Sequence, residues 1–564
     1  MTKFAIALAQ LNAHVGHVSH NLTNFLSARE RSASLGADFI VSPEMFLSGY
    51  PCDDLVLRSD FMMAIERAIS ELVAVSKDGG PAIIIGAPYQ EAGKLYNSVF
   101  VIDDGRIIAR RDKFSLPNYG VFDDKRHFAQ GELKGPVMVR GLKIGLAICE
   151  DIWWPDVCET QAESGADIIV SLNASPFDQA KSDERLAHAV ARTTETSLPF
   201  IYVNMVGGQD ELVFDGGSFA LNIKGQLAAQ LPMMNESLSL VQCQQTAPLA
   251  SDIGYQLTGQ LSPPESGLSL IYRALMLGVR DYVTKNGFPG VALGLSGGID
   301  SALVAILAVD ALGAEAVRCL MLPSGYTADI SKIDADDMAS RLGIRIETIP
   351  IGKGMEAVDE MMAPLFNGYP QDITEENIQS RLRGLLLMAL SNKFGDMILT
   401  TGNKSEYAAG YATLYGDMCG GFAPLKDVWK TLVFDLAKWR NNHVPRGALG
   451  PDGEVVPSRI ITRPPSAELR PDQQDTDSLP PYEVLDAILI ALTEQMASPD
   501  EIVERGFEKK DVEHVSRLLF RAEYKRFQSA PGPKITKRAF GRDRRLPLTS
   551  GFLPINHSHQ EETS

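Results

Sequence analysis

The stretch Gly294-Leu295-Ser296-Gly297-Gly298-Ile299-Asp300-Ser301 decides how the second half of this chain folds. It follows the apolar run 291–293 and precedes the longer apolar run 302–307, an order that predicts a buried strand, a glycine-rich turn and a helix. Such a turn gathers backbone N–H groups and a helix N-terminus at one point, which suits a polyanion. Its glycines allow close approach of the main chain, its serines offer hydroxyl donors, and its aspartate could hold a magnesium ion that bridges phosphates.

This stretch differs from the common phosphate-binding loop, whose G-x-x-x-x-G-K-[ST] pattern needs a lysine that the segment lacks. The run S-G-G-x-D-S resembles instead the pyrophosphatase loop of ATP-using enzymes that adenylate a substrate and release pyrophosphate. The alternative is a plain glycine turn between a strand and a helix. It is disfavoured because two glycines, two serines and an aspartate coincide after a buried strand.

The composition indicates a soluble globular protein with more than one domain. The chain has 564 residues, of which 45% are hydrophobic and 22% charged. A net charge of −18, with a strongly basic stretch only at Lys534–Arg545, argues against nucleic acid as the main partner. No signal pattern and no apolar run of membrane-spanning length is apparent. The six cysteines form no C-x-x-C pair, which argues against a disulfide framework or structural zinc and favours a reducing cytoplasm.

The order of apolar runs and turns predicts two α/β domains. In the first half, strands such as Phe4–Leu11 alternate with helices such as Asn21–Leu35. Polar and proline-containing sequence from Pro248 to Pro264 interrupts this pattern. In the second half, short strands separated by helices, including the amphipathic helix Ile378–Lys393, imply right-handed parallel crossovers. We therefore expect domains at 1–248 and 267–548, a linker at 249–266 and a polar tail at 549–564.

Three polar residues stand where predicted strands of the first half end or leave, namely Glu44, Lys113 and Cys149. Strand ends are where α/β folds assemble sites. A thiol, an ammonium and a carboxylate can serve as nucleophile, charge stabiliser and proton carrier, and the nearby lysine is expected to favour the thiolate. Taken singly, each residue also has an ordinary interpretation, as a small core residue, a solvated lysine or a turn glutamate.

The surroundings of these residues resemble the nitrilase (carbon–nitrogen hydrolase) superfamily. Ser42-Pro43-Glu44, Arg111-Asp112-Lys113 and Ile148-Cys149-Glu150-Asp151 match its three motifs in order, and the resemblance spans residues 1–240. It implies a nitrilase-like α-β-β-α sandwich for the first domain. It also implies that Cys149 attacks an amide carbonyl to form a thioester, that Glu44 shuttles a proton to the departing ammonia, and that Lys113 stabilises the oxyanion.

The second half has two more polar motifs beside the loop. Glu376-Asn377-Ile378-Gln379-Ser380-Arg381 begins the long helix, and Thr400-Thr401-Gly402-Asn403-Lys404-Ser405-Glu406 follows a strand. A Thr-Gly-Asn turn after a parallel strand suits an adenosine moiety. Asp300 and Glu406 are the carboxylates expected to pair on Mg²⁺, which prefers a few carboxylates with phosphate oxygens and water. A helix cap and an ordinary turn are the structural alternatives for these motifs.

Together with the loop, these motifs resemble the NAD synthetase family, and nearly the whole chain resembles its glutamine-dependent form, with a nitrilase-type glutaminase before the synthetase. The resemblance implies a Rossmann-like parallel sheet of the ATP pyrophosphatase type for the second domain, and a homo-oligomer. It departs at 323–329, where Ala-Asp replaces an expected Ser or Thr-Ser, so no contact is assigned there. Motif matching assigns ATP contacts to Gly294, Leu295, Ser296, Gly297, Gly298, Ile299, Asp300, Ser301 and Thr401; deamido-NAD contacts to Asn377, Glu406 and Lys525; and glutamine contacts to Tyr119, Ser175 and Lys181.

The resemblance implies ATP-dependent amidation of deamido-NAD to NAD, the final step of NAD biosynthesis. Ammonia would come from glutamine, with glutamate, AMP and pyrophosphate as the other products. ATP is needed because a carboxylate is a poor acylating agent until its oxygen becomes a good leaving group. The expected partners are therefore the small molecules deamido-NAD, ATP and glutamine, and neither nucleic acid nor membrane.

Two alternatives to this function are left open. One is another glutamine amidotransferase with an ATP pyrophosphatase loop, such as an asparagine or GMP synthetase type. The nitrilase-like first half argues against it, because those enzymes use other glutaminase folds. The other is an amidase with a nucleotide-sensing domain, which would neither consume deamido-NAD nor release AMP.

Overall fold

The structure is a computed structural model, and it describes residues 2–179, 181–246, 254–471 and 473–554. The chain divides into two compact units, Met1–Ser266 and Gly267–Ser564. Each unit has its own sheets and its own buried apolar clusters. Both units mix helices with strands, which confirms the predicted α/β class. Within the described residues, no helix is both long and apolar enough to cross a membrane.

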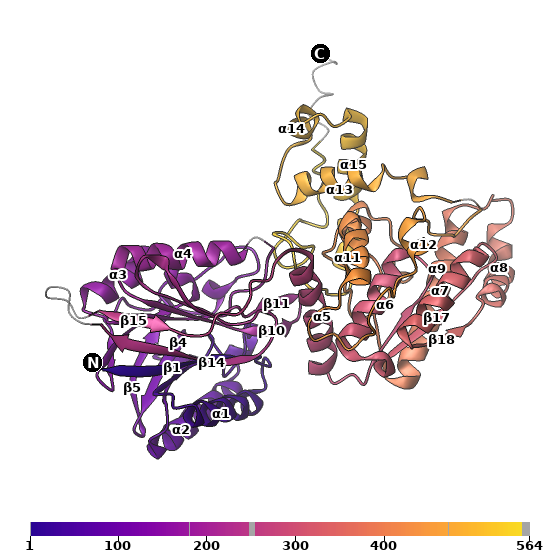
Figure 1. The fold of residues 1–564 in the computed structure, drawn as a ribbon. Coiled ribbons are helices and arrows are strands. Elements are labelled where there is room, and N and C mark those ends of the chain that lie inside the picture. The colour runs from indigo at the N-terminus through magenta and orange to yellow at the C-terminus, as the bar shows by residue number, and fades with distance from the viewer. Residues whose placement is uncertain (1, 180, 247–253, 472, 555–564) are drawn as a thin grey trace, which may run out of the picture. The chain divides into compact units, whose positions relative to one another are not determined.

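The first unit is built around two sheets that pack face to face (Figure 1). Alternate residues of their strands, such as Ile6 and Leu8 on one sheet and Ile144 and Leu146 on the other, meet in one apolar cluster. In the described part of the chain, the first sheet has seven strands in the order β15 (Tyr255–Thr258), β14 (Ser237–Gln245), β1 (Lys3–Gln10), β2 (Phe39–Val41), β3 (Ala82–Glu91), β4 (Lys94–Asp103) and β5 (Arg106–Asp112). The second has six, in the order β13 (Leu227–Gln230), β12 (Phe219–Leu221), β9 (Phe200–Asn204), β8 (Ile168–Asn173), β7 (Leu142–Ile148) and β6 (Val137–Val139), beside the hairpin of β10 (Val206–Gln209) and β11 (Leu212–Asp215).

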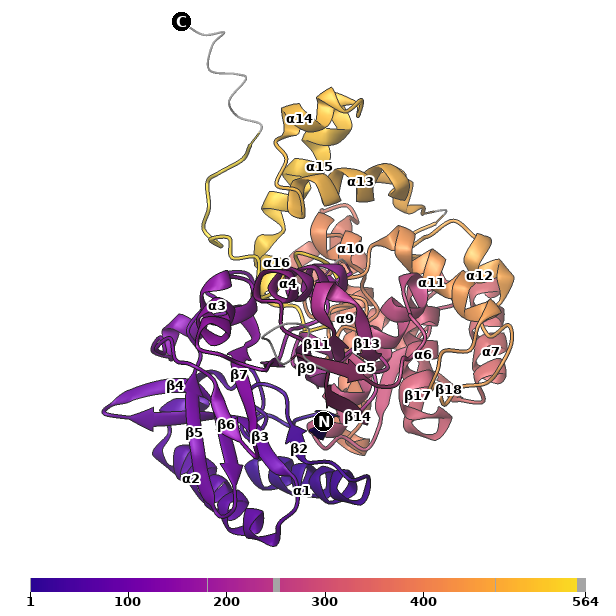
Figure 2. The ribbon, with the colours of Figure 1, turned by 60° about the vertical axis from the view of Figure 1, so that its left-hand side comes forward.

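Helices cover the outer faces of both sheets, which Figure 2 shows from a second direction. Phe25 of α1 (Val18–Ser34) and Ile65 of α2 (Ser59–Val75) pack with Ile83 of the first sheet. Val157 of α3 (Pro155–Glu163) packs with Ile169 of the second sheet, and α4 (Lys181–Thr196) lies on the same face. The layers are therefore α-β-β-α, as the sequence predicts.

Part of the expected linker belongs to the first sheet. Residues 255–258 of the range 249–266 form β15, which pairs antiparallel with β14. Tyr255 and Leu257 are buried while Gln256 and Thr258 are exposed, which is the alternation of a strand with one covered face. This short pattern is hard to detect in the sequence because polar and proline residues flank it. Residues 247–253 of the junction, and 555–564 of the expected tail, lie outside the described residues.

The second unit is organised around a parallel sheet of four strands, as far as the described residues extend. Every pairing within it is parallel, as expected for strands joined by helical crossovers. The strand order is β18 (Arg345–Thr348), β17 (Val317–Met321), β16 (Val291–Gly294) and β19 (Met397–Ile398). The helices are α5 (Gly267–Lys285), α6 (Ile299–Leu312), α7 (Asp329–Leu342), α8 (Gly352–Phe366), α9 (Ile373–Phe394), α10 (Lys404–Ala409), α11 (Lys430–Asn442), α12 (Ser458–Thr462), α13 (Tyr482–Thr493), α14 (Pro499–Glu504), α15 (Lys509–Arg521) and α16 (Glu523–Phe527).

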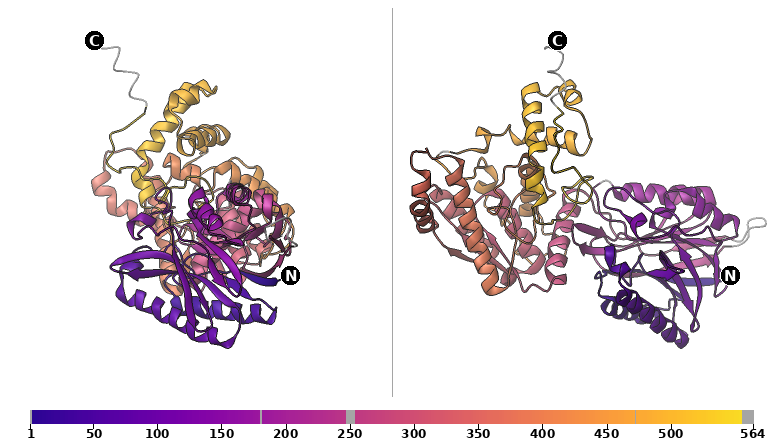
Figure 3. Two further views of the ribbon diagram at one scale, coloured as in Figure 1. Left: turned by 90° about the vertical axis from the view of Figure 1, so that its left-hand side faces the viewer. Right: turned by 180° about the vertical axis from the view of Figure 1, so that it is seen from behind.

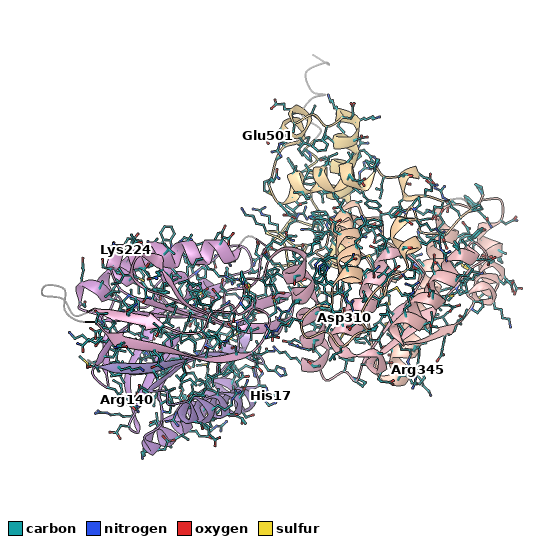
Figure 4. The ribbon with its side chains drawn as sticks, viewed as in Figure 1. His17, Arg140, Lys224, Asp310, Arg345 and Glu501 are labelled. Carbon is teal, nitrogen blue, oxygen red and sulfur yellow. The ribbon has the colours of Figure 1, made fainter. Side chains whose placement is uncertain are left out.

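A buried ion pair anchors the far end of α6, the helix that begins at the glycine-rich loop. Arg440 of α11 donates from Nε to Asp310 Oδ2 at 2.7 Å, and Tyr272 of α5 donates its hydroxyl to the same oxygen at 2.7 Å. All three side chains are fully buried, and Figure 4 marks the position of Asp310 among these helices. Because α6 is held against α5 and α11 at this end, the loop at its other end has a rigid support.

The C-terminal residues form a helical cluster and a buried segment. Helices α13, α14 and α15 group together (Figure 3) around an apolar core. The chain then returns to the core of the unit as residues 531–538, which form neither helix nor strand and which we call the C-terminal strap. Lys404 donates to Thr536 Oγ1 at 2.7 Å, and Asp427 Oδ2 accepts the backbone N–H groups of Ile535 and Thr536, each at 2.7 Å. The strap is therefore part of the folded interior.

Candidate active sites

Glu44, Lys113 and Asp124 form a buried charged cluster in the first unit. Lys113 Nζ lies 2.8 Å from Glu44 Oε1 and 2.8 Å from Asp124 Oδ2, and each side chain is at most 4% exposed. Burial opposes the charged form of Lys113, but Asp124 and Glu44 outweigh it, so the pKa of Lys113 lies well above its ordinary value. The ammonium is therefore a fixed positive charge. Sequence analysis did not single out Asp124.

Glu44 is held in one orientation by further hydrogen bonds. Asn97 of β4 donates its amide to Oε1 at 2.8 Å, and the backbone N–H of Ala174 donates to Oε2 at 2.9 Å. Glu44 follows β2 and Ala174 follows β8, so the ends of strands from both sheets meet at this carboxylate. This is the position expected for a site in an α/β fold.

Cys149 occupies a sharp turn directly after β7, as the first residue of η4 (Cys149–Ile152). Its φ is 46°, which is uncommon for a residue other than glycine. Burial and then Glu44 raise the pKa of Cys149 well above its ordinary value, and Lys113 lowers it by less. The expected thiolate is therefore wrong for this site, because burial and Glu44 outweigh the effect of Lys113, which is already paired with two carboxylates. The thiol must give its proton to a base. Glu44 is the buried carboxylate whose charge acts most strongly on Cys149, so it is the candidate for this base.

Asp151 joins the turn of the nucleophile to the loop of the lysine. Its Oδ1 accepts the N–H groups of Phe114 and Ser115 at 3.0 Å and 2.7 Å, and its Oδ2 accepts the N–H of Ile148 at 2.9 Å. Burial raises the pKa of Asp151 to about 7. Because Lys113 directly precedes Phe114, and Cys149 directly follows Ile148, this one side chain sets the spacing of the two catalytic candidates.

Two of the three predicted glutamine-binding residues, Tyr119 and Lys181, interact with Glu150, the residue that follows Cys149. Tyr119 donates its hydroxyl to Glu150 Oε2 at 2.9 Å and remains 49% exposed. Lys181, the first residue of α4, has its ammonium 4.8 Å from the centre of the Phe122 ring. Its charge acts on both Glu150 and Cys149. A carboxylate and an ammonium therefore lie beside the thiol, which suits the two charged groups of an amino acid.

Ser175, the third of these residues, is buried, and its hydroxyl accepts a hydrogen bond from Arg185. Arg185 of α4 donates from Nε to Ser175 Oγ at 3.1 Å, and its Nη1 donates to both carboxylate oxygens of Asp215, at 2.7 Å and 2.9 Å. All three side chains are buried. The ion pair therefore fixes the serine hydroxyl in place.

The predicted ATP loop lies at the carboxyl end of β16. The N–H of Ser296 donates to Ser301 Oγ at 3.2 Å, and the N–H of Gly298 donates to Ser296 Oγ at 3.2 Å. Gly297 has a φ of +80°, and a Cβ at this position would lie 2.3 Å from the Ser331 carbonyl oxygen. Only glycine fits there, on grounds of both backbone conformation and space.

A cavity of about 700 Å³ in the second unit brings the predicted nucleotide-binding residues together. Its volume suits a cofactor-sized ligand. Pro323 and Thr327, from the segment to which the sequence assigned no contact, also line it. Every residue predicted to contact ATP or deamido-NAD lines this cavity: Gly294, Leu295, Ser296, Gly297, Gly298, Ile299, Asp300, Ser301, Thr401, Asn377, Glu406 and Lys525.

Two of the predicted deamido-NAD residues contact the same wall of the cavity, residues 410–413. Lys525 donates from Nζ to the carbonyl oxygens of Gly410 and Ala412, each at 2.8 Å. Asn377 Oδ1 accepts the hydroxyl of Thr413 at 2.9 Å. These residues are distant in sequence, and the fold makes them neighbours.

Lys430, which sequence analysis did not single out, lies between the two predicted magnesium ligands. Its Nζ is 2.5 Å from Asp300 Oδ2 and 3.3 Å from Glu406 Oε1. Burial opposes its charge, but Asp300 and Glu406 outweigh this effect and raise the pKa of Lys430. Burial, and after it the charge of Asp300, raises the pKa of Glu406, which lies farther from Lys430 than Asp300 does. A sequence signal existed, because Lys430 begins α11, and a cation is disfavoured at a helix N-terminus.

The residues present fit Mg²⁺ only together with substrate oxygens. No group of three His, Cys, Asp or Glu side chains among the described residues is arranged to hold a metal ion. Mg²⁺, however, is usually bound through one or two carboxylates plus phosphate oxygens and water, and Asp300 and Glu406 supply the two. Asn403 orients both, since its Nδ2 donates to Asp300 Oδ1 at 2.8 Å and its N–H donates to Glu406 Oε2 at 3.2 Å.

Comparison with known proteins agrees with this geometry. Residues 5–248 match the carbon-nitrogen hydrolase family, and residues 271–529 match the NAD synthase family. The glutamine-dependent NAD(+) synthetase of Rhodobacter capsulatus is 48% identical, over 97% of this chain and 98% of its own length. The chain belongs to the glutamine-dependent NAD(+) synthetase family. The family member of Acinetobacter baylyi is 43% identical, over 98% of this chain and 100% of its own length.

Solved structures of the family have the same fold. The glutamine-dependent NAD(+) synthetase of Acinetobacter baumannii, solved with ADP, has a TM-score of 0.77 at 41% identity and covers 98% of this chain and 99% of its own. The enzyme of Cytophaga hutchinsonii has a TM-score of 0.80 at 22% identity, covers 98% of each chain and supports the fold alone. Both predicted fold types, the nitrilase-like sandwich and the synthetase sheet, are thereby confirmed. Family membership does not favour either alternative function.

Proposed function

We propose that this protein is a ligase that amidates deamido-NAD to NAD(+) with ATP and with ammonia released from glutamine, the last step of NAD biosynthesis. The observation that carries the proposal is the presence of two separate polar centres. The first unit holds a buried cysteine beside a Glu–Lys pair, and the second holds a nucleotide-sized cavity around the S-G-G-x-D-S loop. The similarity to glutamine-dependent NAD(+) synthetases over nearly the whole chain supports the same reaction.

Glutamine hydrolysis uses the first centre. Glu44 takes the proton from the neutral thiol of Cys149, and the sulfur attacks the side-chain carbonyl of glutamine. The Lys113 ammonium stabilises the oxyanion that forms. Glu44 then passes the proton to the departing ammonia, which leaves a thioester that water hydrolyses to glutamate. Tyr119, Ser175 and Lys181 hold glutamine, with the Lys181 ammonium suited to its α-carboxylate.

Amidation uses the second centre. The N–H groups of the loop 294–301 and the Lys430 ammonium bind the phosphates of ATP, Thr401 contacts ATP, and Asn377, Glu406 and Lys525 contact deamido-NAD. The nicotinate carboxylate attacks the α-phosphate, pyrophosphate leaves, and ammonia displaces AMP from the acyl-adenylate. Asp300 and Glu406 would hold Mg²⁺, which would supply positive charge to the phosphate oxygens. A homo-oligomer and a cytoplasmic location stay predictions.

Replacing the nucleophile tests the proposal. Cys149→Ala should lose NAD formation from glutamine, because a methyl group cannot form the thioester, and should keep NAD formation from an ammonium salt at alkaline pH. Cys158→Ala is the matched control, since Cys158 is also buried in the first unit but lies on α3. It should keep both activities.

The two nitrogen sources separate the ways in which the proposal can fail. If Cys149→Ala still uses glutamine, Cys149 is not the nucleophile. If the unchanged enzyme releases no AMP from ATP and deamido-NAD with either source, the synthetase assignment is wrong.

A further inference from the structure

One ammonium in the nucleotide cavity holds both carboxylates that a magnesium ion would need. Lys430 Nζ contacts Asp300 at 2.5 Å and Glu406 at 3.3 Å. A divalent cation on the same oxygens would repel this ammonium strongly, because like charges at hydrogen-bond distance are very unfavourable in a buried site. When the ion occupies these oxygens, the Lys430 ammonium therefore needs another hydrogen-bond acceptor in their place. This step rests on the proposed function.

Asp475, from η7 (Asp475–Asp477), has an oxygen available for this purpose. The side chain lines the same cavity and is 5% exposed. Its Oδ2 accepts the hydroxyl of Tyr482 at 2.8 Å. Its Oδ1 is buried, and no donor within residues 2–179, 181–246, 254–471 and 473–554 reaches it. A buried carboxylate oxygen without a donor is costly, so such an oxygen calls for an explanation in terms of function.

Tyr482 lies beside both Asp475 and Lys430. The Lys430 ammonium lies 5.1 Å from the centre of the Tyr482 ring, whose hydroxyl is bound to Asp475. The charge of Asp475 already acts on Lys430, after those of Asp300 and Glu406. The ammonium therefore lies beside an aromatic ring whose hydroxyl binds a carboxylate, and both the ring and the carboxylate attract its charge.

We propose that Asp475 is a positioning residue for amidation, which receives the Lys430 ammonium on its free oxygen when magnesium and nucleotide take up Asp300 and Glu406. Lys430 then stays inside the cavity, next to the phosphates, where its charge is needed. The carboxylate that replaces its two original partners offsets the repulsion from the bound ion.

The test is nucleotide binding by the full-length enzyme with and without magnesium. Binding of α,β-methylene-ATP is measured by calorimetry in excess Mg²⁺ and in EDTA, in the unchanged enzyme and in Asp475→Asn. The amide keeps the shape of the side chain but loses its charge. The affinity gained on adding magnesium should fall roughly tenfold or more, because a buried charge would lack its partner, while affinity in EDTA should stay within about twofold.

Glu483→Gln is the matched control, because it removes one negative charge from the exposed position next to Tyr482. It should keep the full magnesium-dependent gain. Should Asp475→Asn fail to fold, a crystal structure of the unchanged enzyme with the analogue and Mg²⁺ decides the question. Lys430 Nζ is then expected within about 3.2 Å of Asp475 Oδ1.

Three results would overturn the inference: an unchanged magnesium-dependent gain in Asp475→Asn, an equal loss of affinity with and without magnesium, or a crystal structure in which Lys430 stays on Asp300 and Glu406 beside the ion. Failure of the proposed function is distinguishable from all three, since it would appear as absence of NAD formation in the unchanged enzyme.

Discussion

Both centres hold a buried lysine between two carboxylates. Lys113 lies between Glu44 and Asp124, and Lys430 lies between Asp300 and Glu406. The attraction within a single buried ion pair often does not offset the lost hydration of the two charges. A second carboxylate adds attraction and keeps each ammonium charged. The second acid also shares the lysine, so that neither carboxylate is fully neutralised. In the first unit this leaves Glu44 able to act as a base.

Asp124→Asn tests this sharing. Without the second acid, Lys113 should pair with Glu44 alone and weaken it as a base. The kcat for glutamine hydrolysis should fall at least about tenfold, within the usual contribution of general base catalysis. Ammonia-driven NAD formation should not change. Asp54→Asn, at an exposed acid of the first unit, is the control. Equal glutaminase rates in both variants would remove Asp124 from the mechanism.

The state of the thiol predicts how the enzyme reacts with an alkylating agent. The pKa of Cys149 lies well above its ordinary value, mainly through burial and Glu44. Iodoacetamide should therefore inactivate glutamine-dependent synthesis at a rate that keeps rising between about pH 7 and about pH 9, with no plateau, because the thiolate is the reactive form. Labelling of Cys149→Ala corrects for the other cysteines. A plateau near neutral pH would mean that the resting enzyme holds a thiolate.

The sequence predicted single residues where they follow strands or belong to motifs. Glu44, Lys113 and Cys149 are of this kind, and their clustering follows from strand ends that meet. Asp124, Lys430 and Asp475 were missed, because no periodic pattern or motif signals their contacts with Lys113, Asp300 and Tyr482. The protonation state of Cys149 was also missed, since it depends on burial and on two acids that share Lys113.

The reciprocal caps of α10 and α14, two helices of the second unit, lie in different places. Asn403 and Glu406 form a capping box at α10, and Ser498 and Glu501 form one at α14. Asn403 also donates to Asp300 in the nucleotide cavity, whereas Ser498 has no part in it. Figure 4 marks Glu501 in the helical cluster of α13–α15. Comparing the two caps therefore separates the contribution of a cap to helix stability from its role in the nucleotide cavity.

Asn403→Ala and Ser498→Ala should each lower the free energy of unfolding by about 1 kcal/mol, the usual effect of losing a cap. Only Asn403→Ala should also lower ammonia-driven NAD formation, because Asp300 loses the amide that orients it. Urea unfolding and steady-state rates measure the two effects. Equal activity in the two variants would show that Asn403 serves stability alone.

Neighbouring glycines of the ATP loop give a second pair of variants. Gly297→Ala places a Cβ 2.3 Å from the Ser331 carbonyl oxygen at a φ of +80° and should abolish NAD formation from both nitrogen sources. Gly298→Ala places its Cβ 3.3 Å from the Ser296 hydroxyl, with no positive φ. It should keep measurable activity. Glutamine hydrolysis in both variants checks that the first unit is intact, and equal loss in both would argue against the steric explanation.

Long periodic elements were predictable, and their ends were less so. The expected helix Asn21–Leu35 is α1 (Val18–Ser34), and the expected helix Ile378–Lys393 is α9 (Ile373–Phe394). The second begins earlier because Asp372 and Glu375 form a capping box, a local signal that apolar periodicity does not include. Strand β15 was missed for a similar reason, since four residues carry too little pattern to stand out between polar neighbours.

At the scale of the whole molecule, the segment matched to the NAD synthase family, residues 271–529, stops before the C-terminal strap. A chain that ends at residue 529 should lose the folded second unit. It would leave Asp427 and Lys404, both buried, without the strap groups that they bind. Ammonia-driven NAD formation and the heat-unfolding transition measure the loss. A chain that ends at residue 554 keeps the strap and is the control. Wild-type unfolding of the shorter chain would show that the strap is dispensable.

The strap also determines when, during synthesis on the ribosome, the protein can finish folding. Residues 531–538 are translated well after Lys404 and Asp427, which need them as partners. The strands and helices of residues 2–246 can pack while the rest of the chain is still being made, since domains generally fold from the N-terminus onward. The second unit cannot bury these charges until residues 531–538 have left the ribosomal exit tunnel. Chaperones would therefore meet this protein with its first unit folded and its second unit still open.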